Sequence, residues 1–311
     1  METVQILQIE PMQEGQRLDN FLIKRLKGVP RSRVYRLIRR GEVRVNKKRC
    51  KPEQRLQNGD KVRIPPYSGS QQSKPARPGS GLEKLLRDSI LLQTEAYLVL
   101  NKPSGLAVHG GSGIRLGLIE AMRQLDPDWR HLELVHRLDR DTSGCLLVAK
   151  NPIYLKKLQS QFKARSVHKK YLALVLGAWP DELQEINAAL KKNELSGGER
   201  IVRVDPDGKQ ARSLFRIHRR FSRATLLEVT LDTGRTHQIR VHCQHAGYPI
   251  VGDQRYLTSQ FRKRDLALSA LTTLCLHAWK LGFTDPASGQ EVVAEADLDS
   301  SFREVMNTLS E

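Results

Sequence analysis

The sequence predicts an α+β protein in which a small α/β domain precedes a larger domain on a long mixed, mainly antiparallel sheet. Residues 67–81 are rich in Ser, Gly and Pro and almost free of apolar side chains, which is the composition of a flexible linker. Downstream, short alternating or apolar runs dominate and do not alternate regularly with helical patterns. We therefore expect a first domain at residues 1–66, a linker at 67–84 and a second domain at 85–311.

Two helices followed by strands are expected in the first domain. Apolar residues recur at helical spacing over 18–26, and Pro30 can open a second helix that Gly41 ends. Valine alternates with arginine at 43–45, and the apolar residues at 62–64 flank another arginine, as in half-buried strands. These elements are enough to enclose a small core.

Strands are expected to outnumber helices in the second domain. The runs that predict them are 97–100, 145–149, 171–176, 200–204, 213–217 and 225–231. Asn151 can cap a helix that follows the second of these runs. Thr233 can cap another helix, whose inward residues Ile239 and Cys243 precede Gly247.

An excess of positive charge indicates a polyanionic partner. The 311 residues include 52 Lys and Arg against 34 Asp and Glu, which gives a net charge of +18. No apolar run approaches the roughly 18 residues of a spanning helix, and residues 1–15 lack the regions of a signal peptide. The four cysteines form no Cys-x-x-Cys pair, which argues against a disulfide framework and a zinc finger. We expect a cytoplasmic protein that binds nucleic acid and no membrane.

Residues 31–51 concentrate this charge. They include ten Lys or Arg and one acid, Glu42, in the second predicted helix and the hairpin after it. A charge run is often only a solvated face, but this density favours contact with the phosphates of RNA or DNA. The residues that we expect to make these contacts are Arg31, Arg33, Arg36, Arg40, Arg44, Lys47 and Lys48.

The most informative stretch is 135–144, Val-His-Arg-Leu-Asp-Arg-Asp-Thr-Ser-Gly. It places acids among arginines and then turns into the apolar run 145–149. A buried strand can hold Asp139 rigidly, and pairing with arginine favours the charged form of a carboxylate. This describes a nucleophile or a base better than a general acid. The alternative is a structural salt-bridge cluster at the start of a strand.

Two further residues are candidates for the same site. Arg235 is expected in the first turn of the helix after Thr233, where free backbone N–H groups favour an anion, so it can pair with Asp139. The alternative is that it fixes a loop carbonyl. Tyr171 begins a strand directly after basic residues, so its ring can stack on a base, although a strand tyrosine is also a common core residue.

No metal and no cofactor are expected. His237, His242, Cys243 and His245 lack the spacing of a zinc site, and the zinc deaminase signature is absent. The glycine-containing segments 101–105 and 109–113 match neither a P-loop nor a dinucleotide fingerprint. We expect these two segments to line a cleft.

The segments described above resemble two known protein families. The segments 15–19, 31–41 and 43–46 resemble the S4 RNA-binding domain. Nearly the whole chain resembles the RluA-type pseudouridine synthases, through Asn101–Gly105, His136–Gly144, Lys170–Ala173, Gly234–Arg240 and Leu276–Ala278. The segment around Asp139 is the most specific of these matches.

The second resemblance implies a pseudouridine synthase fold with a central catalytic cleft, preceded by an S4-like α/β domain. It implies an enzyme that converts uridine in RNA to pseudouridine without metal or cofactor, with Asp139 as the catalytic carboxylate and Tyr171 and Arg235 completing the active site. Arg137 is implied to fill the place of the flipped nucleotide. Large-subunit (23S) ribosomal RNA is the implied substrate, with transfer RNA as the alternative, and nothing in the sequence suggests more than a monomer.

Two rival functions remain open. A non-catalytic RNA-binding factor of ribosome assembly would explain the charge but not the segment around Asp139. A hydrolase would use Ser143 or Ser104 as nucleophile, but no Gly-x-Ser-x-Gly elbow supports it.

Overall fold

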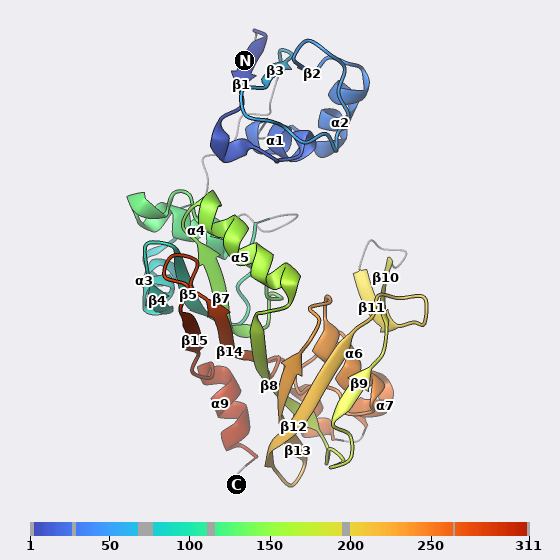
Figure 1. The fold of residues 1–311 in the computed structure, drawn as a ribbon. Coiled ribbons are helices and arrows are strands. Elements are labelled where there is room, and N and C mark those ends of the chain that lie inside the picture. The colour runs from blue at the N-terminus through green and yellow to red at the C-terminus, as the bar shows by residue number, and fades with distance from the viewer. Residues whose placement is uncertain are drawn as a thin grey trace. The chain divides into compact units, whose positions relative to one another are not determined.

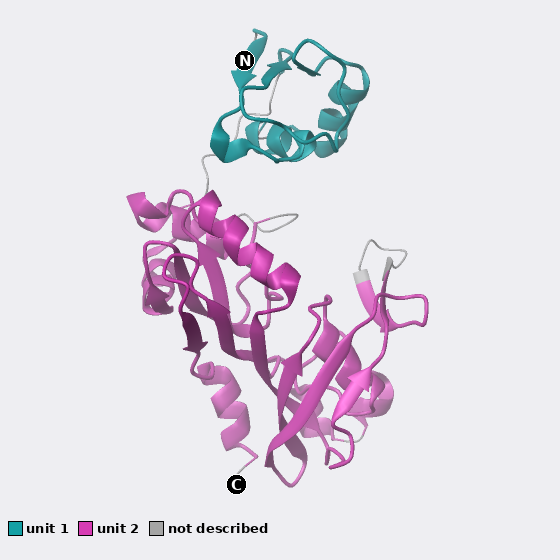
Figure 2. Cartoon of the chain, in the orientation of Figure 1, with its two compact units in different colours: residues 1–76 teal, residues 77–311 magenta. Residues whose placement is uncertain are grey.

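The chain divides into two compact units, residues 1–76 and 77–311 (Figure 2). The computed structural model describes residues 3–26, 29–67, 77–110, 116–194, 200–263 and 265–309. Each unit has its own buried apolar clusters. Within these described ranges no helix is long and apolar enough to cross a membrane.

The first unit packs two helices on a three-stranded antiparallel sheet with β3 in its centre. Its elements are β1 (Gln5–Gln8), the 3-10 helix η1 (Pro11–Gln13), α1 (Leu18–Arg25), α2 (Arg31–Arg39), β2 (Arg44–Val45) and β3 (Lys61–Ile64) (Figure 1). Leu22, Val34 and Val62 are fully buried in one core, which confirms the predicted helical spacing and strand alternation. Gly41 follows α2 with a φ of +71°, the left-handed conformation that glycine adopts at least cost.

The second unit is built on a ten-stranded mixed sheet. Its strands are β4 (Ile90–Gln93), β5 (Tyr97–Lys102), β6 (Glu133–Leu134), β7 (Ser143–Ala149), β8 (His168–Leu176), β9 (Glu185–Asn187), β12 (Arg212–Arg220), β13 (Ala224–Leu231), β14 (Leu276–Thr284) and β15 (Glu291–Glu295). They lie in the order β4-β5-β7-β14-β8-β13-β12-β9, with β15 beside β14 and β6 beside β7. In the described residues every pairing of this sheet is antiparallel except that of β7 with β14, so the predicted sheet type is confirmed.

Helices cover both faces of this sheet. They are α3 (Ser80–Asp88), α4 (Leu118–Leu125), the 3-10 helix η2 (Pro127–Trp129), α5 (Pro152–Ala164), α6 (Gln238–His245), α7 (Ser259–Arg262), α8 (Leu266–Ala270) and α9 (Ser300–Asn307). Leu146 of β7 packs in a cluster with α3 and α4, whereas its neighbour Leu147 packs with Leu158 of α5. All seven residues of β7 are buried, because both faces of this strand are covered.

The predicted linker 67–84 extends too far. The helix α3 begins at Ser80, and Leu86 is fully buried in the same cluster as β5 and β7, with Leu82 packed against it. The helical spacing of these two leucines outweighs the preceding Gly and Ser. Residues 68–76 of the predicted linker lie outside the described residues.

A two-stranded antiparallel sheet stands apart from the long one. The strand β11 (Arg200–Val204), whose run counted toward the predicted sheet, pairs with β10 (Leu190–Glu194) instead. Val202 of β11 packs with Val241 of α6 and with Tyr256 in a small separate cluster. This contact brings the β10–β11 hairpin next to α6.

Candidate active site

Asp139 lies in the loop that connects β6 to β7. Val135 and Leu138 of this loop are buried in the clusters on opposite faces of the sheet, and the Thr142 N–H donates to the Asp139 carbonyl over 3.3 Å. The Asp139 side chain is 26% exposed. The carboxylate therefore stands at the surface of a turn whose neighbours are anchored in the core.

The close approach of β7 and β14 determines that Tyr171 lies next to this loop. Gly144 of β7 has a φ of +103°, and a Cβ atom there would lie 2.2 Å from the carbonyl oxygen of Ala278 in β14. Only glycine allows β7 and β14 to run side by side at this point, where their parallel register pairs these two residues. Because Ala278 is also opposite Tyr171 of β8, the approach brings the Asp139 loop next to that tyrosine.

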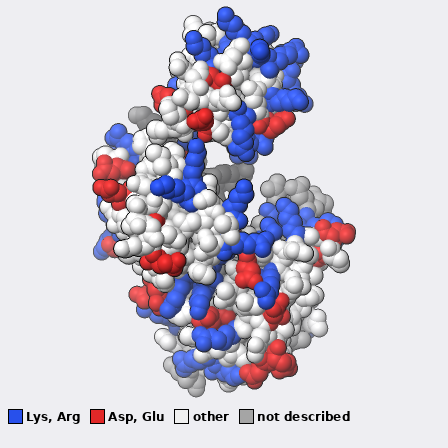
Figure 3. Space-filling model, viewed as in Figure 1, with Lys and Arg blue, Asp and Glu red and all other residues white. Residues whose placement is uncertain are grey.

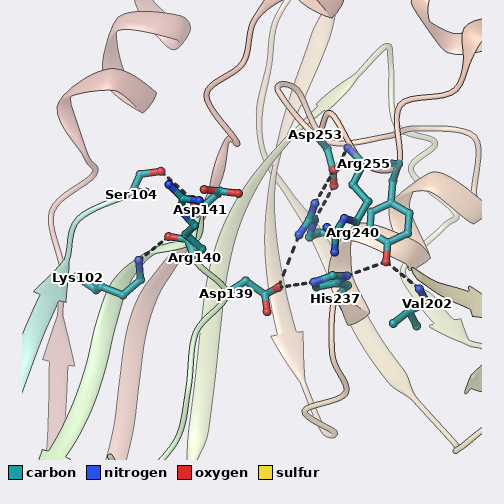
Figure 4. Close-up of polar contacts among 11 residues, drawn as sticks. Lys102, Ser104, Asp139, Arg140, Asp141, Val202, His237, Arg240, Asp253 and Arg255 are labelled. Atoms are coloured by element: carbon teal, nitrogen blue, oxygen red, sulfur yellow. Dashed lines mark hydrogen bonds and ion pairs between the residues drawn. The ribbon is translucent and has the colours of Figure 1, made fainter. Parts of the chain in front are cut away.

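The segment after β5 holds the loop from the other side. The Lys102 ammonium is fully buried and donates to three carbonyls, those of Pro103 (2.7 Å), Leu106 (2.8 Å) and Arg140 (2.8 Å). The Ser104 hydroxyl donates to the Asp141 carbonyl over 2.8 Å (Figure 4). Burial lowers the pKa of Lys102 to about 8, against the opposing charges of nearby carboxylates.

Residues 101–105, which we expected to line a cleft, do not line the cavity beside Asp139, and Lys102 and Ser104 brace the loop instead. Of the second such segment, 109–113, residues 111–113 lie outside the described part of the chain.

A cavity of about 460 Å³ opens beside Asp139. Small-molecule sites usually measure about 300–1,000 Å³. Four predicted residues, Arg137, Asp139, Tyr171 and Arg235, line it together. The other charged or titratable residues in its wall are Lys192, His237, Arg240 and Arg255. We refer to it below as the Asp139 cavity.

The cation next to Asp139 is Arg240. Its Nη1 is 3.8 Å from Asp139 Oδ2, while its Nε and Nη2 each donate to the Asp253 carboxylate over 2.7 Å (Figure 4). Burial opposes the charge of Arg240, but the hydrogen bonds and charge of Asp253, and then the charge of Asp139, outweigh it and raise the pKa of the guanidinium. A buried bidentate pair thus fixes a permanent cation beside the carboxylate.

The predicted pairing of Arg235 with Asp139 is wrong. The helix α6 begins at Gln238, so Arg235 precedes the helix and does not occupy its first turn. His237 has a φ of +54°, a left-handed conformation that stops the helix from extending further back. Arg235 is an exposed residue of the cavity wall, and its Nε donates to the Gln210 carbonyl over 3.1 Å, which is the loop-fixing alternative.

Thr233 does not cap α6 in the way that the sequence predicted. The Gln238 side-chain oxygen accepts from the Thr233 hydroxyl over 2.8 Å and from the Arg235 N–H over 3.0 Å. The turn before α6 is therefore closed by an amide side chain from within the helix. Arg240 itself carried a usable signal in the sequence, because a charge between two inward apolar residues of a helix requires a buried partner.

His237 is a second neighbour of the carboxylate. Its Nε2 is 3.6 Å from Asp139 Oδ2, and its Nδ1 is 2.7 Å from the Tyr256 hydroxyl. Burial lowers the pKa of His237 although the charge of Asp139 opposes this shift, so the ring is neutral at neutral pH. The sequence singled this residue out only as an unsuitable metal ligand. In the described residues no group of three His, Cys, Asp or Glu side chains is arranged to hold a metal ion.

Tyr171 belongs both to the core and to the cavity. Its ring packs against the apolar clusters on two sides, and it lines the cavity as a half-buried residue. Burial, and then the charge of Asp139, raise the pKa of its hydroxyl, so the phenol stays neutral. The core alternative is therefore confirmed, and stacking of the ring on a base in the cavity stays a prediction.

The predicted phosphate contacts lie on the first unit. Figure 3 shows Lys and Arg gathered over α2 and β2. Of the seven predicted residues, Arg33 is half-buried and the other six are exposed: Arg31, Arg36, Arg40, Arg44, Lys47 and Lys48. We call these seven residues the α2–β2 surface. One of them is partly tied down, since Arg44 donates to the carbonyls of Gly41 and Lys47, each over 3.2 Å.

The serines of the rival hydrolase do not lie in the Asp139 cavity. Ser143 is buried, with its hydroxyl 2.8 Å from Nδ1 of the equally buried His277. Ser104 donates to a backbone carbonyl, as described above. Neither serine therefore lies with Asp139, Tyr171 and Arg137 in the Asp139 cavity.

Comparison with known proteins agrees with this geometry. The profile of the RNA pseudouridylate synthase family matches residues 96–245, and that of the S4 domain matches residues 16–62. Ribosomal large subunit pseudouridine synthase C of Haemophilus influenzae is 48% identical over 99% of this chain and 96% of its own length. The protein of the same name from Escherichia coli is 49% identical over 99% of this chain and 97% of its own length.

Solved structures show the same fold for the second unit. Human RNA pseudouridylate synthase domain containing 4 superposes with a TM-score of 0.59 at 24% identity, covering 74% of this chain and 96% of that one. Human RNA pseudouridylate synthase domain containing 1 gives 0.56 at 25% identity, covering 76% and 98%. With full-length relatives at nearly half identity, this chain belongs to the RNA pseudouridylate synthase family and carries an S4 domain at its start.

Proposed function

We propose that this protein isomerises uridines of large-subunit ribosomal RNA to pseudouridine, with Asp139 as the catalytic carboxylate. The observation that carries the proposal is the arrangement around that carboxylate. Both of its charged or polar neighbours, Arg240 and His237, come closest to it at Oδ2, and within the described residues no hydrogen bond reaches Oδ1. One oxygen is held while the other is left for a substrate in the cavity.

The reaction needs no oxidant, reductant or metal. The bond between ribose C1′ and uracil N1 breaks, the base turns, and C1′ joins C5, which loses its proton while N1 gains one. Asp139 can either add to C1′, as a retaining glycosidase does, or remove the 2′ proton to form a glycal. In both routes the reacting group is the Asp139 carboxylate, and the Arg240 guanidinium lies 3.8 Å from its Oδ2.

Tyr171 and Arg137 have different roles when the nucleotide flips out of the RNA. The Tyr171 ring, fixed by the core behind it, offers a flat surface on which the uracil can stack while it is detached. Arg137 is exposed at the cavity, two residues from Asp139, so its guanidinium can enter the space that the flipped nucleotide leaves. The family resemblance suggested Arg235 as a partner of Asp139. Because Arg235 lies at the cavity wall and does not pair with Asp139, its proposed role is to contact the RNA backbone.

The role of the first unit is to increase the affinity for RNA. The α2–β2 surface offers exposed cations to phosphates, as the match to the S4 domain supports. The relatives named for the ribosomal large subunit support ribosomal RNA over transfer RNA as substrate. We also propose that the protein acts in the cytoplasm and as a monomer.

Tritium release from RNA that contains 5-tritiated uridine tests the proposal. The wild type should release tritium from a 23S transcript faster than from transfer RNA, and Asp139→Asn should abolish release while RNA binding and melting temperature are retained. Asp141→Asn is the matched control, because this exposed carboxylate two residues away does not line the cavity, and it should retain most of the rate. Release by Asp139→Asn at the wild-type rate would reject the assignment, and a preference for transfer RNA would reject the substrate.

A further inference from the structure

His237 sits where the chain enters α6 and is the one histidine that lines the Asp139 cavity in the described residues. Its φ of +54° is uncommon for a residue other than glycine. Such a conformation persists only where the surroundings hold it, and it often marks a functional position. The side chain is 10% exposed and points toward Asp139 (Figure 4). On its other side, Nδ1 contacts the Tyr256 hydroxyl.

A chain of contacts determines which ring nitrogen carries the proton. The Val202 N–H donates to the Tyr256 hydroxyl oxygen over 3.1 Å, and the same oxygen is 2.7 Å from His237 Nδ1. In the described residues the hydroxyl proton has no other acceptor than Nδ1. Nδ1 is therefore the acceptor, so the neutral ring carries its proton on Nε2, the nitrogen that faces Asp139 Oδ2 at 3.6 Å.

We propose that His237 is a positioning residue for Asp139: its Nε2–H, aligned by Tyr256, tethers Oδ2 and turns Oδ1 toward the substrate. This inference rests on the proposed function. Arg240 approaches the same Oδ2 from a distance of 3.8 Å, so the two groups together restrict the rotation of the carboxylate. A separation of 3.6 Å is too long for a direct hydrogen bond, and we expect it to shorten when substrate fills the cavity.

Tyr256 gives the first test, because its hydroxyl can be removed alone. In Tyr256→Phe the ring remains against His237, with ring centroids 5.6 Å apart, and under the Arg240 guanidinium at 5.1 Å. We expect kcat for tritium release to fall roughly tenfold with KM for RNA unchanged, since orientation acts on the reacting state and not on RNA affinity. Tyr248→Phe is the control, because this tyrosine packs on Trp179 away from the cavity, and it should leave kcat unchanged.

His237 itself gives the second test. His237→Leu removes the donor, whereas His237→Gln can still present an N–H to Asp139, so kcat should decrease in the order wild type, His237→Gln, His237→Leu. In the His237→Leu background, Tyr256→Phe should cause no further loss, because the tyrosine acts through the histidine. If His237→Leu does not fold, His237→Gln takes its place in this cycle. Melting temperatures of all variants show which proteins are folded.

Each outcome separates this inference from the proposed function. If the wild type releases no tritium from RNA, the proposed function fails. If the wild type is active and Asp139→Asn inactive, but Tyr256→Phe and His237→Leu match the wild type, only the positioning role fails. The positioning role would also be overturned if Tyr256→Phe lowered kcat by the same factor in the wild type and in the His237→Leu background.

Discussion

The Asp139 cavity and the α2–β2 surface use positive charge in opposite ways. In the cavity, the Arg240 side chain is 8% exposed and two of its nitrogens are bound to the fully buried Asp253. On the α2–β2 surface, six of the seven predicted cations are exposed. A buried, paired cation keeps one position and can therefore orient a reacting group, whereas exposed cations attract a polyanion over a distance and are screened by salt.

The largest expected effect comes from removing the buried cation. Arg240→Met leaves the buried Asp253 carboxylate without its cation, although the backbone N–H groups of Arg255 and Tyr256 still donate to it. We therefore expect a loss of about 3–5 kcal/mol in the free energy of unfolding. Because Asp139 also loses its cation, kcat should fall by roughly 100-fold. Denaturant unfolding and tritium release measure the two effects.

Two other substitutions sharpen that result. Arg240→Lys keeps the charge but loses the bidentate geometry, so it should fold and show an intermediate kcat. Arg235→Met removes an exposed arginine from the same wall and should change stability by less than about 0.5 kcal/mol. A loss of kcat in Arg235→Met equal to that in Arg240→Met would contradict the assignment of Arg240 as the cation that orients Asp139.

A smaller effect is expected at Lys102, which is buried but lies outside the cavity. As the pH rises through about 8, this ammonium loses a proton and retains two N–H groups for three carbonyls, one of them in the Asp139 loop. The wild-type kcat should therefore fall on the alkaline side. Lys102→Met should have a reduced kcat without this decline, and titration of the RNA bases cancels in the ratio of the two profiles. Identical pH profiles for the two proteins would show that Lys102 does not control the loop.

The smallest effect per residue is expected on the α2–β2 surface. Replacing Arg36 and Arg40 by Gln should weaken RNA binding and lower the slope of log K against log salt by about 0.7–0.9 for each phosphate that is no longer neutralised. The kcat at saturating RNA should not change. The control is the double variant Lys84→Gln and Arg303→Gln, which removes two exposed cations elsewhere. It therefore has the same net charge as the variant of Arg36 and Arg40. If both pairs lower the slope equally, the binding is not specific to the α2–β2 surface.

The elements were largely predictable where one local pattern dominated. Uninterrupted apolar residues at 145–149 predicted a buried strand, and β7 is buried along its whole length. The end of the linker was misjudged because the Ser and Gly at 79–81 resemble linker residues, while the tertiary contacts of Leu82 and Leu86 make them the start of a helix.

The candidate site was predictable in its members but not in its pairings. Asp139, Tyr171 and Arg137 were all expected, and the structure places them around one cavity. Arg235 was expected to be the partner of Asp139 because a helix starting after Thr233 would have presented it to an anion. The left-handed backbone at His237 delays that helix, and Asp253 then holds Arg240 in place.

The sequence by itself determined the overall positive charge, the basic density at 31–51, the mixed sheet and the presence of a carboxylate at the start of a buried strand, because composition and local periodicity express these properties directly. Only the tertiary structure decided which cation and which histidine meet Asp139. Those partners lie about a hundred residues further along the chain. Their approach depends on the close contact of Gly144 with Ala278 and on the turn before α6, which are interactions between distant segments.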